Sequence, residues 1–383
     1  MLKEEIEEKS ILHLSKKESL KGKKVILRID VNTSLGENGT VDPGEDWRIV
    51  KSYQTINFLV EQGASVILLS HIGRDPQESL KPVFEFMSQE IHLGFVPSYD
   101  YKLIEDMIGT MQHGSVLMLE NVRSQAGEQE NDPQYLAPIV KLCDLYVNDA
   151  FSVSHREHAS VHAITTMLPS YFGLQFVDEV SYLSESLSRE GTKTLILGGA
   201  KFGTKLKLLE KMLPQLSHVL MGGALANVFL RERGFEIGAS FADDVDVSAM
   251  ITNDKIILPI DCVDQDGDLM HIDQVKEDDQ ILDIGHETEA LFEQVIAHSD
   301  VVLWNGPMGK YEDGYTSGSV SIAKSLSHSN AFSVTGGGDT ATVILEEGVE
   351  DSFDFISTGG GAMLDFLVDG SLAGIDVILN RDS

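Results

Sequence analysis

A short apolar run at residues 194–197 ends in the two glycines Gly198 and Gly199, and leucines at helical spacing follow at once. This pattern predicts a buried strand that turns sharply into a helix. Glycine at such a turn lets backbone N–H groups approach a ligand, and the N-terminus of the following helix favours anions. Lys201 and Lys205 lie four residues apart, so on a helix both would face the same anion. The stretch does not fit the Walker A pattern, and the alternative is a tight turn with two solvated lysines.

Short apolar runs alternate with helical patterns along the whole chain. We expect strands at 24–31, 65–70, 115–119, 144–147, 194–197, 218–221, 255–259, 301–303, 332–335 and 353–357. Helices are expected at 47–60, 82–91, 101–111, 133–142, 224–233 and 317–327, and from residues 339 and 362 onward. This alternation predicts parallel sheets covered by helices on both faces. Residues 178–188 are expected to form a helix that connects the halves, and the charged, turn-rich section 261–279 is expected to leave the sheet.

The composition limits the class of protein. A length of 383 residues, set against roughly 150 per domain, predicts two domains. The net charge of −32 argues against binding to nucleic acid or to anionic membranes. Two cysteines form neither a metal-ligand pattern nor a disulfide framework, which fits a reducing compartment. The N-terminus lacks a signal-peptide pattern and no apolar run approaches the ~20 residues of a membrane span, so we expect a cytoplasmic protein.

Polar and cationic side chains follow the expected strands of the first half. Because the carboxyl ends of parallel strands share one edge of a sheet, these side chains are expected to meet there. The fork-shaped guanidinium of arginine suits carboxylate and phosphate, so the set predicts a pocket for a small, doubly charged anion. Each arginine alone could instead be a surface residue paired with an acid. The candidates are Asp30, Asn32, Arg48, His71, Arg74, Arg123 and Arg156.

In the second half, the turns after the expected strands are rich in glycine. Glycine turns at the starts of several helices would expose backbone N–H groups, which could bind a polyphosphate. The turns are Gly198-Gly199, Gly222-Gly223, Gly336-Gly337-Gly338 and Gly359-Gly360-Gly361. Asp339 offers a hard oxygen ligand for a phosphate-bound Mg²⁺, and Glu312 a possible acceptor for ribose hydroxyls. One half built for a small anion and one for a nucleotide together suggest phosphoryl transfer.

The motifs resemble those of the phosphoglycerate kinase family, in the family's order and over nearly the whole chain. They are Arg28-Ile29-Asp30-Val31-Asn32, Ser70-His71-Ile72-Gly73-Arg74, Leu119-Glu120-Asn121-Val122-Arg123, Val147-Asn148-Asp149-Ala150-Phe151, Gly198-Gly199-Ala200-Lys201, Trp304-Asn305-Gly306-Pro307-Met308-Gly309, Gly336-Gly337-Gly338-Asp339-Thr340 and Ser357-Thr358-Gly359-Gly360-Gly361. The resemblance implies a fold of two doubly wound, Rossmann-like α/β domains joined by a helix and hinge. It places a phosphoglycerate-binding domain at 1–172, an interdomain helix at 173–189 and a nucleotide-binding domain at 190–371. A C-terminal tail, 372–383, would pack back on the first domain.

By the same resemblance, the first-half residues would hold 3-phosphoglycerate or 1,3-bisphosphoglycerate, and the second half would hold ATP or ADP with Mg²⁺. The nucleotide residues would be Gly198, Gly199, Ala200, Lys205, Gly222, Gly223, Asn305, Pro307, Glu312, Gly337, Gly338, Asp339 and Thr340, with Asp339 as the metal ligand. Arg48, Lys201, Gly338 and Gly361 would act on the phosphoryl group in transit. The family also implies a monomer that closes about its hinge.

The chain departs from the family's usual residues at several loop positions. These are Thr33-Ser34, Ser124, Ser152 and Phe202-Gly203-Thr204. Because of these departures, the alternative remains that the chain is a catalytically weakened relative of the family that binds nucleotide through the same fold. A Rossmann dehydrogenase is disfavoured, because no Gly-x-Gly-x-x-Gly turn is followed by an acidic residue about 20 positions on.

Overall fold

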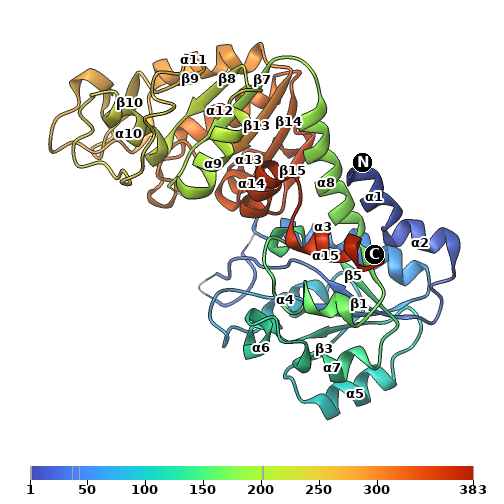
Figure 1. Ribbon diagram of the computed structural model, residues 1–383. Coiled ribbons are helices and arrows are strands. Elements are labelled where there is room, and N and C mark those ends of the chain that lie inside the picture. Colours follow the sequence, from blue (N-terminus) through green and yellow to red (C-terminus); the bar gives the residue numbers. More distant parts are fainter. Residues whose placement is uncertain (1, 37, 43, 201, 383) are drawn as a thin grey trace. The chain divides into compact units, whose positions relative to one another are not determined.

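The computed structural model describes residues 2–36, 38–42, 44–200 and 202–382. The chain divides into two compact units (Figure 1). The first comprises the residues up to Ser181 together with those from Ser371 onward, and the second is Tyr182–Gly370. Each is built around a six-stranded sheet. Among the described residues, no helix has both the length and the apolar character needed to cross a bilayer.

The sheet of the first unit is parallel throughout, with the strand order β3-β4-β2-β1-β5-β6. At the centre, Arg28 of β1 pairs with Leu69 of β2 and with Asn148 of β5. The segments that follow these three strands therefore start at one edge of the sheet. The strands are β1 (Lys24–Arg28), β2 (Ser65–Leu69), β3 (Leu93–Val96), β4 (Val116–Leu119), β5 (Leu145–Asn148) and β6 (Ser170–Phe172).

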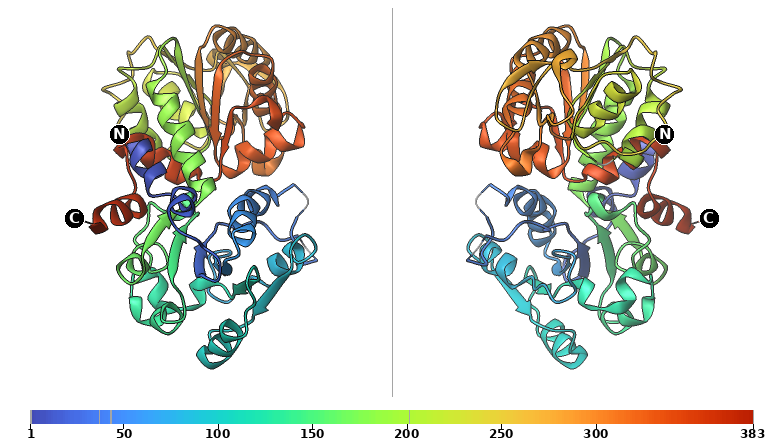
Figure 2. Two further views of the ribbon diagram at one scale, coloured as in Figure 1. Left: turned by 90° about the vertical axis from the view of Figure 1, so that its right-hand side faces the viewer. Right: turned by 90° about the vertical axis from the view of Figure 1, so that its left-hand side faces the viewer.

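Helices cover this sheet because their apolar residues recur at helical spacing. In α3 (Trp47–Glu61), Ile49, Ile56 and Leu59 are buried and join the same core as Val25 of β1. Figure 2 shows helices on both faces of each sheet. The other helices of the main body are α4 (Lys81–Met87), α5 (Tyr101–Gly109), α6 (Ala126–Gln129) and α7 (Ala137–Val140), with 3-10 turns η1 (Val122–Ser124), η2 (Pro133–Tyr135), η3 (Phe151–Val153) and η4 (Ala163–Thr166).

Both chain ends belong to the first unit. The C-terminal helix α15 (Ala373–Leu379) contacts α1 (Leu2–Glu8), which α2 (Ile11–Lys17) follows (Figure 1). The backbone N–H of Gly374 donates to the carbonyl of Ser154 over 2.8 Å. A Cβ on Gly374 would lie 2.9 Å from the Ser154 side chain, so this close contact needs glycine. The turn η8 (Asn380–Asp382) follows α15.

The second unit repeats the parallel architecture, with the strand order β15-β14-β13-β7-β8-β9. Its strands are β7 (Lys193–Leu197), β8 (His218–Met221), β9 (Ile256–Ile257), β13 (Val301–Asn305), β14 (Phe332–Gly336) and β15 (Phe355–Ser357). Its helices are α9 (Phe202–Met212), α10 (Gly223–Glu232), α11 (His286–Ala297), α12 (Ser317–Ser327), α13 (Gly338–Glu346) and α14 (Gly360–Asp369), with turns η5 (Ile272–Gln274), η6 (Tyr311–Asp313) and η7 (Glu350–Ser352).

A small antiparallel sheet interrupts the alternation, as the charged section 261–279 predicts. It has the order β11-β10-β12, from β10 (Asp261–Val263), β11 (Leu269–His271) and β12 (Asp283–Ile284). The helix predicted at 178–188 is part of α8 (Leu174–Ser188), which begins in the first unit and ends in the second.

Several elements differ from the sequence-based expectation. β3, β6, α1, α2 and α6 are not predicted, because each is short and its hydrophobic pattern spans too few residues to stand out. α11 is also not predicted; it has 12 residues, but only Thr288, Phe292 and Ile296 are buried. The helix expected at 133–142 is broken into η2 and α7, each with a proline at its start. The strand expected at 255–259 keeps only the two residues of β9.

Candidate active site

In each sheet, the chain adds strands first on one side of its initial strand and then on the other, so the strand order reverses at one pair of neighbouring strands. Ligands of open α/β sheets bind beyond the carboxyl ends of such a pair. In the first unit the pair is β1 and β5, and in the second it is β7 and β13. Asp30 and Asn32 follow β1, and His71 follows β2. Gly198 and Gly199 follow β7, and Gly306 follows β13. The candidate residues thus emerge at the edges where a ligand is expected.

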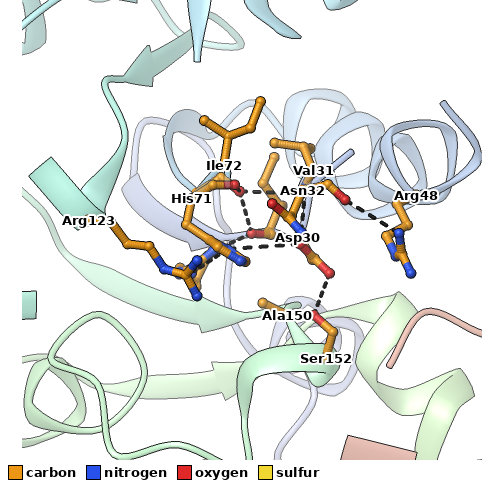
Figure 3. Close-up of polar contacts among 12 residues, drawn as sticks. Asp30, Val31, Asn32, Arg48, His71, Ile72, Arg123, Ala150 and Ser152 are labelled. Carbon is orange, nitrogen blue, oxygen red and sulfur yellow. Dashed lines mark hydrogen bonds and ion pairs between the residues drawn. The ribbon is translucent and has the colours of Figure 1, made fainter. Parts of the chain in front are cut away.

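Asp30 and Asn32 tie the loops of the first edge together (Figure 3). The Asp30 carboxylate accepts from the N–H of Asn32 over 3.0 Å and from the hydroxyl of Ser152. The side-chain oxygen of Asn32 accepts from the N–H of Gly73 over 2.8 Å. Ser152, one of the departures from the family's usual residues, therefore fixes the orientation of Asp30.

Four arginines occupy this edge with different degrees of exposure. Arg74 and Arg156 are exposed, whereas Arg48 and Arg123 are half-buried. The Arg48 guanidinium lies 4.5 Å from the ring centroid of Trp47 and donates to the carbonyl of Asn32 over 3.4 Å (Figure 3). Stacking on an aromatic ring holds such a cation in one direction.

Arg123 is held by the loops that follow β2 and β4. Its guanidinium donates to the carbonyl of Gly73, and its backbone N–H donates to Asn121 over 3.1 Å. Burial lowers the pKa of the Arg123 guanidinium, and the positive charges of Arg156 and Arg28 lower it further. An anionic ligand beside Arg123 would relieve this repulsion.

A fifth arginine, Arg28 at the end of β1, is not among the candidate residues predicted from the sequence. It is 1% exposed, and its Nε donates to the Ser160 hydroxyl over 2.9 Å. Its terminal nitrogens reach the carbonyl of Ile29 and, over 3.3 Å, Nδ1 of His71. The motif Arg28-x-Asp30-x-Asn32 is the signal that could have identified it, although a strand residue normally indicates packing.

His71 is buried beside these cations. Burial lowers the pKa of its imidazole well below the usual value, and the charges of Arg28, Arg123, Arg156 and His158 add to this effect. His71 is therefore neutral at pH 7. Its Nδ1 lies 4.0 Å from the Asp30 carboxylate, a spacing that is not an ion pair when the ring is uncharged.

In the second unit, four helices begin at the carboxyl ends of parallel strands: α9 after β7, α10 after β8, α13 after β14 and α14 after β15. Their N-termini carry backbone N–H groups without intrahelical partners. Helix N-termini at one sheet edge favour the binding of phosphate groups. Gly338 and Asp339 lie in the first turn of α13, and Gly361 in the first turn of α14.

Close backbone packing explains the glycines at this edge. The N–H of Gly199 donates to the carbonyl of Pro307 over 2.8 Å, and that of Gly223 to the carbonyl of Met308 over 2.6 Å. A Cβ on Gly198 would lie 2.0 Å from the Pro307 carbonyl oxygen. Real Cβ atoms do not approach so closely, so glycine is required for the β7 and β13 loops to meet.

Side chains from the predicted nucleotide set hold these loops. Asn305 Nδ2 donates to the carbonyl of Gly336 over 2.8 Å, and the N–H of Gly306 donates to the Thr340 hydroxyl over 3.0 Å. The buried Lys205 donates to the carbonyl of Gly198. Ala200, Glu312 and Asp339 are exposed, Gly222 is buried and Gly337 is half-buried. Lys201 lies outside the described residues.

The second unit offers Mg²⁺ few side-chain ligands. No group of three or more carboxylate, histidine or cysteine side chains suited to a metal ion occurs within the described ranges. Mg²⁺ in nucleotide sites is held by one or two carboxylates together with phosphate oxygens and water. The exposed carboxylate of Asp339, beside the helix N-termini that favour phosphate, fits that arrangement.

A cationic sheet edge in one unit and phosphate-favouring helix N-termini in the other define a two-domain α/β phosphotransferase. A profile of the family described as phosphoglycerate kinase matches residues 15–370. The chain belongs to the phosphoglycerate kinase family. The predicted family, α/β fold and phosphotransferase class are thereby confirmed.

Individual phosphoglycerate kinases are similar to this chain over nearly its full length. The phosphoglycerate kinase of Geotalea daltonii is 36% identical over 96% of this chain and 98% of its own. That of Koribacter versatilis is 38% identical over 94% and 98%, respectively. Among solved structures, phosphoglycerate kinase from Pyrococcus horikoshii matches with a TM-score of 0.85 and 28% identity, over 96% of this chain and 98% of that one. The enzyme from Coxiella burnetii matches with a TM-score of 0.78 and 29% identity, over 96% and 99%.

Proposed function

We propose that this protein transfers a phosphoryl group reversibly between 1,3-bisphosphoglycerate and ADP, giving 3-phosphoglycerate and ATP, as a step of glycolysis and gluconeogenesis. The observation that carries this proposal is the family match over nearly the whole chain. The alternative of a weakened, nucleotide-binding relative is not favoured, because the charged residues of the family motifs are retained.

The first unit is proposed to bind the phosphoglycerate. Its ligands would be Asp30, Asn32, Arg48, His71, Arg74, Arg123 and Arg156. The gathering of cations on one edge of a protein with a net charge of −32 supports this assignment. An arginine fork can hold either the carboxylate or the phosphate of the substrate through two parallel hydrogen bonds.

The second unit is proposed to bind the nucleotide at the N-termini of α9, α10, α13 and α14. Backbone N–H groups in the first turns of α13 and α14 would contact the phosphates. The N–H groups of Gly199 and Gly223 already donate to loop carbonyls, so these glycines would contribute by allowing the loops to pack closely. Glu312 would accept from ribose hydroxyls, and Asp339 would be the metal ligand. Bound Mg²⁺ would neutralise charge on the phosphate oxygens as the phosphoryl group moves.

The chemistry needs no general base. The carboxylate of 3-phosphoglycerate is ionised at pH 7 and can attack the γ-phosphorus of ATP directly. Catalysis then consists of in-line positioning and of stabilising charge on the transferred group. Arg48 and Lys201 are proposed to supply that charge, together with backbone N–H groups of Gly338 and Gly361.

Transfer also requires both ligands in one site, so we propose that the units close about α8 when both ligands are bound. Closure would exclude water, which otherwise hydrolyses the acyl phosphate. We further propose that the enzyme acts as a cytoplasmic monomer.

A coupled assay of ATP formation from 1,3-bisphosphoglycerate and ADP tests the proposal. Arg123→Gln is expected to raise the KM for 1,3-bisphosphoglycerate by about tenfold or more, because one charge-assisted contact is lost. Lys141→Gln removes an exposed cation from the same unit and should leave that KM unchanged. Nucleotide binding by calorimetry without any ATP formation would instead support the weakened relative.

A further inference from the structure

A buried carboxylate, Glu128 in α6, lies behind the cationic edge of the first unit and has no part in the proposed reaction. Glu128 is 0% exposed. Its carboxylate accepts from the Ser160 N–H over 3.0 Å, from the Ser160 hydroxyl over 2.7 Å and from the Tyr135 hydroxyl. A buried carboxylate with three donors is held in one position.

Ser160 links this carboxylate to Arg28. The Ser160 hydroxyl has one proton, which it donates to Glu128, so its oxygen is left to accept from Arg28 Nε over 2.9 Å. The direction of both hydrogen bonds is therefore fixed. Since guanidinium is planar, fixing Nε also fixes the direction of the terminal nitrogens.

One of those terminal nitrogens lies 3.3 Å from Nδ1 of His71. A guanidinium can only donate, so Nδ1 must accept and cannot carry the ring proton. The neutral ring then carries its proton on Nε2. The described residues give Nε2 no hydrogen-bond acceptor, which leaves this donor for a ligand oxygen.

We propose that Glu128 and Ser160 are positioning residues of the phosphoglycerate site. Through Arg28 they hold the imidazole of His71 as the Nε2–H tautomer, so that the ring presents a donor to the anionic substrate. This inference rests on the proposed function only for the identity of that anion.

The other groups around the ring are compatible with this role. The Asp30 carboxylate lies 4.0 Å from Nδ1, beyond hydrogen-bond distance. Arg123, Arg156 and His158 are the remaining charged or titratable groups that act on His71. The cations oppose an imidazolium, and a neutral ring can donate from only one nitrogen. The tautomer therefore decides whether His71 offers a donor or an acceptor to the ligand.

The first test needs no substitution that alters this network. Nitrogen-15 NMR of the histidine side chains in the full-length protein distinguishes the two neutral tautomers and the imidazolium, and a His71→Gln spectrum assigns the signal among the 12 histidines. We expect a neutral ring protonated on Nε2 at pH 7. A proton on Nδ1, or an imidazolium, would overturn the proposal. This result does not depend on turnover, so it stands apart from failure of the proposed function.

The second test removes the Ser160 hydroxyl that links Glu128 to Arg28. Ser160→Ala is expected to give a mixture of tautomers and to raise the KM for 3-phosphoglycerate by about tenfold, since an ångström-scale misplacement is enough for such a loss. The nucleotide KM and kcat should change by less than about twofold if the ring acts only in binding. Ser160→Thr keeps the hydroxyl and should restore both the tautomer and the KM.

Tyr135→Phe is the matched control, because it removes the third donor to Glu128 and leaves the Ser160 link in place. It should leave the His71 tautomer and the KM unchanged. A Ser160→Ala protein with a native circular dichroism spectrum, the wild-type tautomer and the wild-type KM would show that the link is only structural. If Ser160→Ala does not fold, the wild-type tautomer decides the question.

Discussion

Asp149, buried just after β5, should make the stability of the first unit depend on pH. Its carboxylate accepts from the N–H of Phe176 over 3.1 Å, and its Oδ2 has no hydrogen-bond partner among the described residues. Burial raises the pKa of Asp149 from 3.8 to about 7, and the nearby charge of Asp178 adds to the increase. The ionised form is therefore the costly one in the folded protein.

The direction of the pH dependence of stability follows from proton binding. The folded protein holds the Asp149 proton more tightly than the unfolded chain does, so the stabilisation is complete below about pH 3.8 and is lost as the pH rises towards 7. Asp149→Asn keeps the acceptor for Phe176 and cannot ionise. At about 1.36 kcal/mol per pH unit, the unfolding free energy of the variant relative to wild type should increase by up to about 3 kcal/mol between pH 5 and pH 8.

Urea titrations at pH 5 and pH 8, followed by circular dichroism, measure this difference. The control is Glu61→Gln, which removes an exposed carboxylate at the end of α3 and should alter stability by less than about 0.5 kcal/mol. A variant-minus-wild-type difference that is the same at both pH values would refute the account, because it would mean that ionising Asp149 costs the fold nothing.

Three further outcomes are expected. Lys201→Ala should lower kcat far more than it raises the nucleotide KM, because the charge is needed mainly during phosphoryl transfer; steady-state kinetics with ADP varied measure both. An unchanged kcat with a raised KM for ADP would instead make Lys201 a ligand of the bound nucleotide before transfer. Gly198→Ala should destabilise the second unit by roughly 1–3 kcal/mol in urea and weaken nucleotide binding, since its Cβ would lie 2.0 Å from the Pro307 carbonyl oxygen, whereas Gly203→Ala in α9, with nothing within 4 Å, should be neutral or stabilising. The melting temperature should rise with added KCl, because salt screens the self-repulsion of a net charge of −32; a steady fall would contradict this.

The alternation of strands and helices was predictable because buried parallel strands are continuous apolar runs. The run expected at 65–70, for example, contains β2, whose five residues are all buried. β3 was not predictable in this way. It contains Gly94, and only its terminal residues, Leu93 and Val96, are buried, so its local pattern does not distinguish it from a loop.

The site residues were predictable where a polar or charged side chain directly follows a strand, as Asp30 and His71 do. Arg28 was missed because it belongs to the strand itself, and the sequence does not show that its side chain reaches His71. Glu128 was missed for a related reason. It lies in a polar, turn-rich segment where an acidic residue is normally solvated, and only the fold brings Ser160 and Tyr135 to it.

The central claim is that a carboxyl oxygen of 3-phosphoglycerate accepts the γ-phosphoryl group of ATP. Incubation of the protein with both substrates and hydroxylamine tests it directly, because hydroxylamine traps an acyl phosphate as the hydroxamate. The account predicts the hydroxamate of 3-phosphoglycerate and ADP in equal amounts, and neither from the protein without 3-phosphoglycerate. Formation of ADP and inorganic phosphate without the hydroxamate, at the same rate with and without 3-phosphoglycerate, would contradict it.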